Sequence, residues 1–427
     1  MSDYKIETKC VQSGYEPKNG EPRVLPIYQS TTYKYDSSEH LAQLFDLTAP
    51  GHMYSRISNP TLECVESKLA DLEGGVGAML TSSGQAANLT AIFNITSCGQ
   101  NFICSSAIYG GTINLFSVTM KRMGIEVRYV NAAMSDEEIL SKFDENTRCV
   151  FGETVANPAL EIFDIERFAK LAHSKGVPLI VDNTFATPVL CRPFEFGADI
   201  VTHSTTKYMD GHASIVGGAL IDSGKFDWTV DGKYPELTQP DDSYHGIVYT
   251  ESFGAAAYIT KARVQLMRDL GVPQQPITAY MLNLGLESLP FRMERHCANA
   301  TEIAKRLEKD SRVEWINYPA LESSPDHELF KKYLPNGCCG VISFGVKGGR
   351  AAATKFMDSM KLGKIVVHVA DSRTCVLHPA STTHRQLTDE QLVAAGITPD
   401  LIRLSVGVEN VEDIWKDIDS ALSNSQN

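Results

Sequence analysis

Four small polar residues, Ser82-Ser83-Gly84-Gln85, follow the apolar run VGAML at a predicted strand-to-helix turn. Small side chains there let backbone N–H groups and the positive helix end reach an anion, so Gly84 and Gln85 are predicted to form part of a phosphate cradle. The alternative is a plain connection. The turn matches neither the G-x-G-x-x-G fingerprint nor the G-x-x-x-x-G-K-[ST] loop, which argues against NAD(P) and ATP as ligands.

Two more predicted strands end in groups that could act with this turn. Asp182 closes the apolar run PLIV, where an unpaired carboxylate is costly and must meet a donor or a cation. The alternative role of Asp182 is a helix N-cap. Lys207 follows the hydroxyls of Ser204, Thr205 and Thr206 directly off a strand. A lysine at a strand end is usually solvated, but these hydroxyls predict a second set of donors for the same anion.

Tyr109, in IYGGT, and Asn157, in ETVANP, end two other predicted strands. Together the strand ends offer a phosphate cradle, a carboxylate that can keep a ring nitrogen protonated, an aromatic ring for stacking and a lysine that can form a Schiff base. Pyridoxal 5′-phosphate is the cofactor that needs this whole set. Each motif alone is weak, whereas their joint order is hard to obtain by accident.

The elements that position these groups alternate regularly from about residue 76 to 220. Short apolar runs predict strands, and the segments between them, with apolar residues three and four apart, predict helices. The strand candidates are VGAML, NFICS, EVRYV, RCVFGETV, PLIVDNT, ADIVTHST and VGGALI. This alternation predicts an α/β fold with a mostly parallel seven-stranded sheet between helices, whose sites lie beyond the carboxyl ends of the strands.

The rest of the chain divides around this block. Residues 1–60 show little periodicity and predict an extended N-terminal arm, and Asn59-Pro60 starts a helix. Residues 61–270 predict the large cofactor-binding domain, and residues 271–427 a smaller C-terminal α+β domain. The acidic, proline-rich segment 226–249 is longer than most loops and is a candidate lid over the site.

The composition is that of an ordinary globular protein, with 427 residues, 43% hydrophobic and 21% charged. The net charge of −13 argues against nucleic acid as a partner.

No run approaches the roughly 18 apolar residues that cross a bilayer, and MSDYKIETKC lacks a signal peptide's apolar centre, so we expect no membrane contact and a cytoplasmic location. The ten cysteines are scattered and the histidines show no ligand spacing, so we expect no disulfide framework and no metal site.

Seven segments carry a resemblance to a known family: YSRISNPT, TSSGQAA, IYGGTINLF, VDNTF, HSTTKYMDGH, HPASTTHRQL and LIRLSVGVEN. Over nearly its whole length the chain resembles the Cys/Met metabolism family of fold type I pyridoxal-phosphate enzymes, and most closely the O-acetylhomoserine sulfhydrylases. YPELTQPDDSYHG and RDLGV are similar to that branch, whereas Gly111 stands where methionine γ-lyases carry cysteine. Gln274-Gln275-Pro276 departs from the usual Ser-Pro, with no assigned consequence.

The resemblance implies roles for the matching residues. Lys207 would hold the cofactor as a Schiff base and then shuttle protons, and Asp182 would pair with the pyridinium nitrogen. Tyr109 would stack on the ring and take part in proton transfer near the leaving group, the alternative being a core tyrosine. Gly84, Gln85, Ser204 and Thr206 would hold the phosphate, and Asn157 would reach the ring hydroxyl.

Four residues outside the strand ends also gain implied roles. Tyr54 and Arg56, in the arm, would complete the phosphate site of the neighbouring subunit, with Tyr54 also near the substrate; the alternative is an arm arginine that pairs with a surface acid. The active site then needs at least a dimer, and family habit favours a homotetramer. Arg403, on a predicted strand, offers a planar fork that would clamp the substrate's α-carboxylate. His368 stands where relatives place Ser or Asn near that carboxylate; it would add a titratable donor there, or be only structural.

The implied reaction is γ-replacement. O-acetyl-L-homoserine and sulfide, or methanethiol, would give homocysteine, or methionine, and acetate in methionine biosynthesis. Alternatives are cystathionine γ-synthase or γ-lyase chemistry on the same scaffold, and a non-catalytic oligomer that binds the cofactor. The sequence is compatible with acetyl, succinyl or phospho esters of homoserine, with either thiol, with a dimer or a tetramer, and with side elimination activity.

Overall fold

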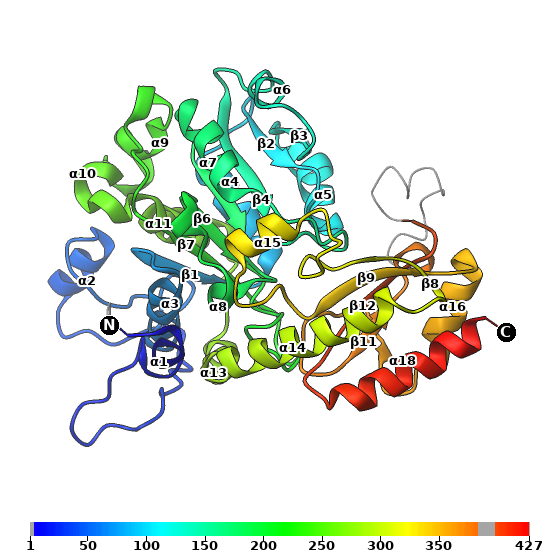
Figure 1. Ribbon diagram of the computed structural model, residues 1–427. Helices are drawn as coiled ribbons and strands as arrows, with labels where there is room; N and C mark the ends of the chain where they lie inside the picture. The colour runs from blue at the N-terminus through cyan, green and yellow to red at the C-terminus, as the bar shows by residue number, and fades with distance from the viewer. Residues whose placement is uncertain (1–3, 383–397, 427) are drawn as a thin grey trace.

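The computed structural model describes residues 4–382 and 398–426 and is built around two β-sheets (Figure 1). The larger sheet has the strand order β1-β7-β6-β5-β4-β2-β3. Its strands are β1 (Gly77–Thr81), β2 (Asn101–Ser105), β3 (Glu126–Val130), β4 (Thr147–Glu153), β5 (Leu179–Asp182), β6 (Ile200–His203) and β7 (Gly218–Asp222). Only β7 runs antiparallel to its neighbours. The predicted α/β fold with a mostly parallel seven-stranded sheet is confirmed.

Both faces of this sheet are covered by helices, which is why its central strands are largely apolar; the edge strand β3, with Glu126 and Arg128, is less buried. Successive residues of β5 point to opposite sides: Val181 belongs to one buried cluster and Ile180 to the other. The first cluster includes residues of α3 (Pro60–Glu73), α7 (Ile165–Ser174), α13 (Pro276–Glu287) and α14 (Leu289–Glu308). The second includes residues of α4 (Gly84–Phe93), α10 (Tyr249–Phe253) and α11 (Ala257–Lys261).

The helix boundaries follow local signals. α3 begins after Asn59, whose side chain accepts a hydrogen bond from Thr61 N, and Gly74 ends it with a left-handed φ of 81°. Ser83 caps α4 in the same way, and so places the N-terminus of α4 just beyond the carboxyl end of β1. Ser135 and Glu138 form a capping box that starts α6 (Asp136–Leu140), which is shorter than the periodic segment SDEEILSKF.

The second sheet is smaller and has the order β10-β11-β12-β9-β8. Its strands are β8 (Val313–Asn317), β9 (Val341–Val346), β10 (Lys364–Ile365), β11 (Cys375–Leu377) and β12 (Leu401–Ser405), accompanied by α15 (His327–Tyr333), α16 (Gly349–Ser359) and α18 (Val411–Ser425). The segments CCGVISFGV and IRLSVGV contain β9 and β12. Figure 1 shows this sheet on one side of the larger one and the N-terminal segment on the other. The exact division at residue 271 stays a prediction.

The N-terminal arm contains two helices that the sequence pattern did not predict, α1 (Ile6–Gln12) and α2 (Ser38–Phe45). Both are only about two turns long, too short for a periodic apolar face to stand out. All ten cysteines are free thiols and eight are buried, as expected for small apolar side chains. Among the described residues, no helix is both long and apolar enough to cross a membrane.

Candidate functional site

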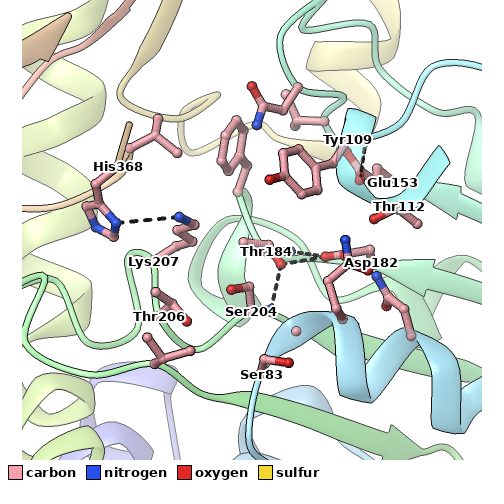
Figure 2. Close-up of a pocket in the computed structure, with 18 of the residues that line it drawn as sticks. Ser83, Tyr109, Thr112, Glu153, Asp182, Thr184, Ser204, Thr206, Lys207 and His368 are labelled. Carbon is pink, nitrogen blue, oxygen red and sulfur yellow. Dashed lines mark hydrogen bonds between the residues drawn. The ribbon is translucent and has the colours of Figure 1, made fainter. Parts of the chain in front are cut away.

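A cavity of about 340 Å³ opens beyond the carboxyl ends of the central strands, between the larger sheet and the second sheet (Figure 2). Ten of the twelve residues predicted from the sequence line it: Gly84, Gln85, Tyr109, Asn157, Asp182, Ser204, Thr206, Lys207, His368 and Arg403. The first eight come from the larger sheet's strand ends and the last two from the second sheet. The two sheets therefore share one site.

The floor of the cavity is a cradle at the N-terminus of α4. A Cβ atom on Gly84 would lie 2.7 Å from Ser204 Cβ, so glycine is what lets these two turns approach each other. Gln85 Oε1 is buried and has no hydrogen-bond partner among the residues that the structure describes. The Thr206 hydroxyl exchanges hydrogen bonds with the backbone of Gly217 at 3.0 and 3.1 Å. The free N–H groups of a helix start beside hydroxyls favour an anion.

Asp182 is buried at the end of β5 and meets only neutral donors. Its carboxylate accepts from Thr184 N at 3.1 Å and from Asn88 Nδ2 at 3.2 Å. No cationic side chain of the described residues pairs with it. Glu153 lies close by and accepts from Tyr109 N at 2.7 Å. Burial, and then the nearby charge of Asp182, raise the pKa of Glu153. A buried carboxylate with neutral partners is suited to a cationic group on a ligand.

Lys207 and His368 lie next to each other in the wall of the cavity. Lys207 Nζ lies 3.5 Å from His368 Nδ1, as the dashed line in Figure 2 shows. Burial, followed by the charge of Arg403, lowers the pKa of Lys207 to about 8. Burial, followed by the charge of Lys207, lowers the pKa of His368 to about 4. At pH 7 the His368 imidazole is therefore uncharged, and about a tenth of Lys207 is in the free amine form that can act as a nucleophile or base.

Arg403 projects from β12 and is buried, with 7% of its surface exposed. Its Nη1 donates to Asn157 Oδ1 at 3.2 Å and its Nη2 donates to Val367 O at 3.2 Å. No carboxylate within the described residues pairs with it, and burial lowers the pKa of Arg403. Burying a guanidinium without an acid partner costs free energy, so this position is suited to an anionic ligand.

The chain's similarity to known proteins agrees with this geometry. Residues 7–423 match the model of a family described as Cys/Met metabolism PLP-dependent enzyme. The chain belongs to this family. It is 45% identical over 420 residues to a homocysteine synthase of Schizosaccharomyces pombe, covering 98% of each chain. It is also 45% identical to an O-acetyl-L-homoserine sulfhydrylase of Thermus thermophilus, covering 98% of this chain and 100% of that one.

A solved structure shows the same fold. The chain superposes with a TM-score of 0.95 on a Campylobacter jejuni protein described as a candidate O-acetylhomoserine (thiol)-lyase, at 36% identity, covering 98% of this chain and 100% of that one. That protein carries a pyridoxyl-lysine phosphate. The fold of the Cys/Met metabolism family and its dependence on pyridoxal phosphate therefore apply to this chain.

The cavity fits that cofactor on its own evidence. The cradle at Gly84 suits a phosphate, and Asp182, which lacks a cation, suits a protonated ring nitrogen. The phosphate, the ring and a bound amine together need a cavity of this order of size. No group of three or more His, Cys, Asp or Glu side chains in residues 4–382 and 398–426 is arranged to hold a metal ion.

Two predicted residues do not line this chain's own cavity. Tyr54 is 40% exposed, and the Arg56 guanidinium lies 5.3 Å from the centre of its ring. Both belong to the arm, away from the second sheet. The structure alone assigns neither a role in the site.

The expectation that segment 226–249 is a lid is wrong for the cavity of its own chain. None of its residues lines the cavity. Its aromatic side chains are core instead: Trp228 stacks on Tyr258 at 5.0 Å, and the buried Tyr234 hydroxyl donates to Arg148 O at 2.8 Å. The sequence shows an acidic, proline-rich segment, but the aromatics within it decide where it packs.

Several lining residues were missed in the sequence: Asn88, Thr112, Glu153, Val155, Thr184, Phe185, Val216, Val367 and Val369. For some of them a signal existed. Asn88 follows Gly84 by one helical turn, Glu153 opens ETVANP and Thr184 closes VDNT. The apolar residues carried none, because nothing marks an isolated valine as lining a cavity. Of the motif HPASTTHRQL, the part after Thr382 lies outside the described residues.

Proposed function

We propose that this chain catalyses γ-replacement on O-acetyl-L-homoserine, with sulfide or methanethiol as the incoming thiol, to give L-homocysteine or L-methionine and acetate. The observation that carries the proposal is a buried arginine, with no acid partner in the described part of the chain, in the same cavity as a lysine of lowered pKa. The first group suits the carboxylate of an amino acid and the second suits proton transfer at its α-carbon. The activities of two relatives that are 45% identical to the chain, a homocysteine synthase and an O-acetyl-L-homoserine sulfhydrylase, support this substrate.

In this proposal the cradle and the strand ends hold the cofactor. Gly84, Gln85, Ser204 and Thr206 bind the phosphate, Thr206 by giving up its bond to Gly217 O. Asp182 binds the ring nitrogen, and Asn88 and Thr184 keep its carboxylate in place. Asn157 Oδ1 accepts a hydrogen bond from Arg403, so Asn157 Nδ2 is available to donate to the hydroxyl of the cofactor ring. Tyr109 stacks on the ring, with its backbone held by Glu153.

Pyridoxal phosphate supplies an aldehyde that condenses with amines and a protonated ring that accepts an electron pair from the neighbouring carbon. The chain supplies the proton transfers. Lys207 Nζ, with a pKa of about 8, would take the Cα proton and pass it to the bound cofactor, and would then take a Cβ proton. After the thiol has added at Cγ, one proton would return to Cβ and one to Cα. Arg403 holds the α-carboxylate and His368 faces the same end of the substrate. Tyr109 assists departure of acetate from Cγ.

Part of the cavity wall is apolar. Phe185, Val216 and Val367 are among the residues that line it. Such a wall disfavours water and accepts a small thiol, so it protects the reactive substrate from hydrolysis. Sulfide and methanethiol are both small and polarisable enough for this space.

We also propose that the active unit is at least a dimer, in a homotetramer. Tyr54 and Arg56 lie outside their own cavity, and both residues are exposed. Their proposed place is the phosphate site of the neighbouring subunit, with Tyr54 also near the substrate. The arm (1–60), the large domain (61–270) and the small domain (271–427) would then each contribute to a site.

The test is product analysis with the purified protein. We expect homocysteine from O-acetylhomoserine and sulfide together, none when either is omitted, and none from Lys207→Ala. Supplying cysteine in place of sulfide separates this activity from that of a cystathionine γ-synthase. Failure to form homocysteine with cofactor bound would sink the proposed substrate pair.

A further inference from the structure

His368 makes a contact that substrate binding does not require. It follows β10 in the second sheet, whereas Lys207 follows β6 in the larger sheet, and their Nδ1 and Nζ atoms lie 3.5 Å apart (Figure 2). Its other ring nitrogen, Nε2, is buried, has no hydrogen-bond partner within residues 4–382 and 398–426, and lies 3.8 Å from Asp371 Oδ2. The three side chains thus form a row, with the imidazole in the middle.

The segment that carries His368 is anchored beside the lysine. Ser372 donates through its N and its Oγ to Gly211 O, at 2.9 and 2.7 Å. Arg373 Nη2 donates to His212 O. Ala370 N donates to Ser405 Oγ at 2.8 Å. Because Gly211 lies only four residues after Lys207, these contacts hold the imidazole and the amine in one frame.

The charges around the row decide which atom donates. Lys207 in its ammonium form has no lone pair, so His368 Nδ1 must be the acceptor and the ring proton must sit on Nε2. Asp371 Oδ2 lies on the Nε2 side, and its Oδ1 is taken by Arg373 N. Asp371 therefore favours the tautomer that the contact with Lys207 needs.

The imidazole accepts a hydrogen bond but not the proton itself. The pKa of His368 is lowered to about 4 by burial and by Lys207, whereas that of Lys207 is about 8. The two pKa values differ by about four units, and each unit is a factor of ten in the equilibrium constant. Transfer of a proton from Lys207 to His368 is therefore disfavoured by roughly ten-thousandfold. Asp371 and Asp210 raise the pKa of His368 and Arg403 lowers it further, but burial outweighs them.

We propose that His368 is the positioning residue of the catalytic lysine. Its Nδ1 accepts a hydrogen bond from Lys207 Nζ and so fixes rotation about the Cε–Nζ bond, while Asp371 holds the imidazole in the accepting tautomer. One N–H of the neutral Lys207 amine then donates to His368, and the nitrogen lone pair remains available to accept a proton from the substrate. No proton is transferred between the two side chains. The inference rests on the proposed role of Lys207 as the base.

Two variants separate this role from a structural one. His368→Leu removes the acceptor and keeps a similar volume. His368→Asn is the matched control, because its amide oxygen can accept the same hydrogen bond and it does not titrate. In the holoenzyme the readout is exchange of the Cα proton of L-norleucine, which has no leaving group, in D2O. In the cofactor-free protein it is the pH dependence of Lys207 acetylation by acetic anhydride.

We expect His368→Leu to slow exchange of the Cα proton by roughly ten- to a hundredfold, because one hydrogen bond to a charged or reacting group is lost. The L-norleucine concentration that gives half the maximal rate should change little. The midpoint of Lys207 labelling should fall by about one pH unit, because the ammonium loses an acceptor. His368→Asn should restore both readouts.

The inference is overturned if the leucine variant exchanges and labels like the wild type, or if the asparagine variant is as slow as the leucine variant. His368→Val gives the same test if the leucine variant does not fold. A protein that shows the expected exchange but makes no homocysteine would keep this inference and lose the proposed substrate pair.

Discussion

Replacing Arg403 by lysine tests the carboxylate site most directly. The substitution keeps a positive charge on β12 but loses the planar fork that can bind both oxygens of a carboxylate. In the structure Nη1 of Arg403 donates to Asn157 Oδ1, and Nη2 donates to Val367 O and, at 3.5 Å, to His368 O. Of the five N–H groups, the Nε–H and the second N–H of Nη1 donate to no protein atom of the described residues, so two N–H groups remain for a substrate carboxylate.

The magnitude follows from the bonds that the fork supplies. Arg403→Lys exchanges a two-point contact for one point, and a hydrogen bond between charged groups contributes roughly 1.5–3 kcal/mol. We therefore expect kcat/KM for O-acetylhomoserine to fall roughly ten- to 150-fold. Arg403→Leu loses both bonds and the charge, so its loss should approach the square of that factor.

The assay compares each enzyme on O-acetylhomoserine and on its carboxamide, which cannot pair with a cation. Wild type should strongly prefer the carboxylate, Arg403→Lys should prefer it less, and Arg403→Leu should show almost no preference. Cofactor content should stay near one per chain in all three. If Arg403→Leu keeps the wild-type preference, Arg403 does not bind the carboxylate and the proposed orientation of the substrate is wrong.

Three further predictions concern neighbouring residues. In Gly111→Ala the new Cβ would lie 2.4 Å from Tyr109 Cε1, so the Tyr109 ring must move. We expect kcat/KM to fall roughly a hundredfold while the melting temperature stays nearly unchanged. Unchanged kinetics would contradict a catalytic role for Tyr109. Asp182→Asn should weaken cofactor binding roughly ten- to 150-fold, measured by absorbance after equilibrium dialysis, because the ring nitrogen loses its anion; equal affinity would argue against this pair. An equal mixture of the inactive variants Lys207→Ala and Arg56→Ala should regain about a quarter of wild-type activity if Arg56 serves a partner in a symmetric dimer. No recovery after subunit exchange would place Arg56 in its own chain's function.

Much of the fold was predictable because its signals are local. Most strands of the larger sheet are short apolar runs that are buried on both faces, with the edge strand β3 as an exception, and several helices begin at polar caps such as Asn59 and Ser83. The predicted site residues at strand ends follow from the same pattern, because parallel strands present their carboxyl ends at one edge. The short helices α1 and α2 were missed because two turns do not establish a period.

Residue type and position along the chain determined the α/β class, the seven strands and the set of groups at their ends, because these depend on neighbours a few residues apart. Only the tertiary structure decided which distant groups meet. It placed Arg403 and His368, more than 160 residues after Lys207, in the same cavity, and among the residues that it describes it left the Arg403 guanidinium without an acid. It also buried Trp228 and Tyr234 in the core instead of over the site. Such outcomes depend on how two sheets pack together, and no local pattern in the chain encodes that packing.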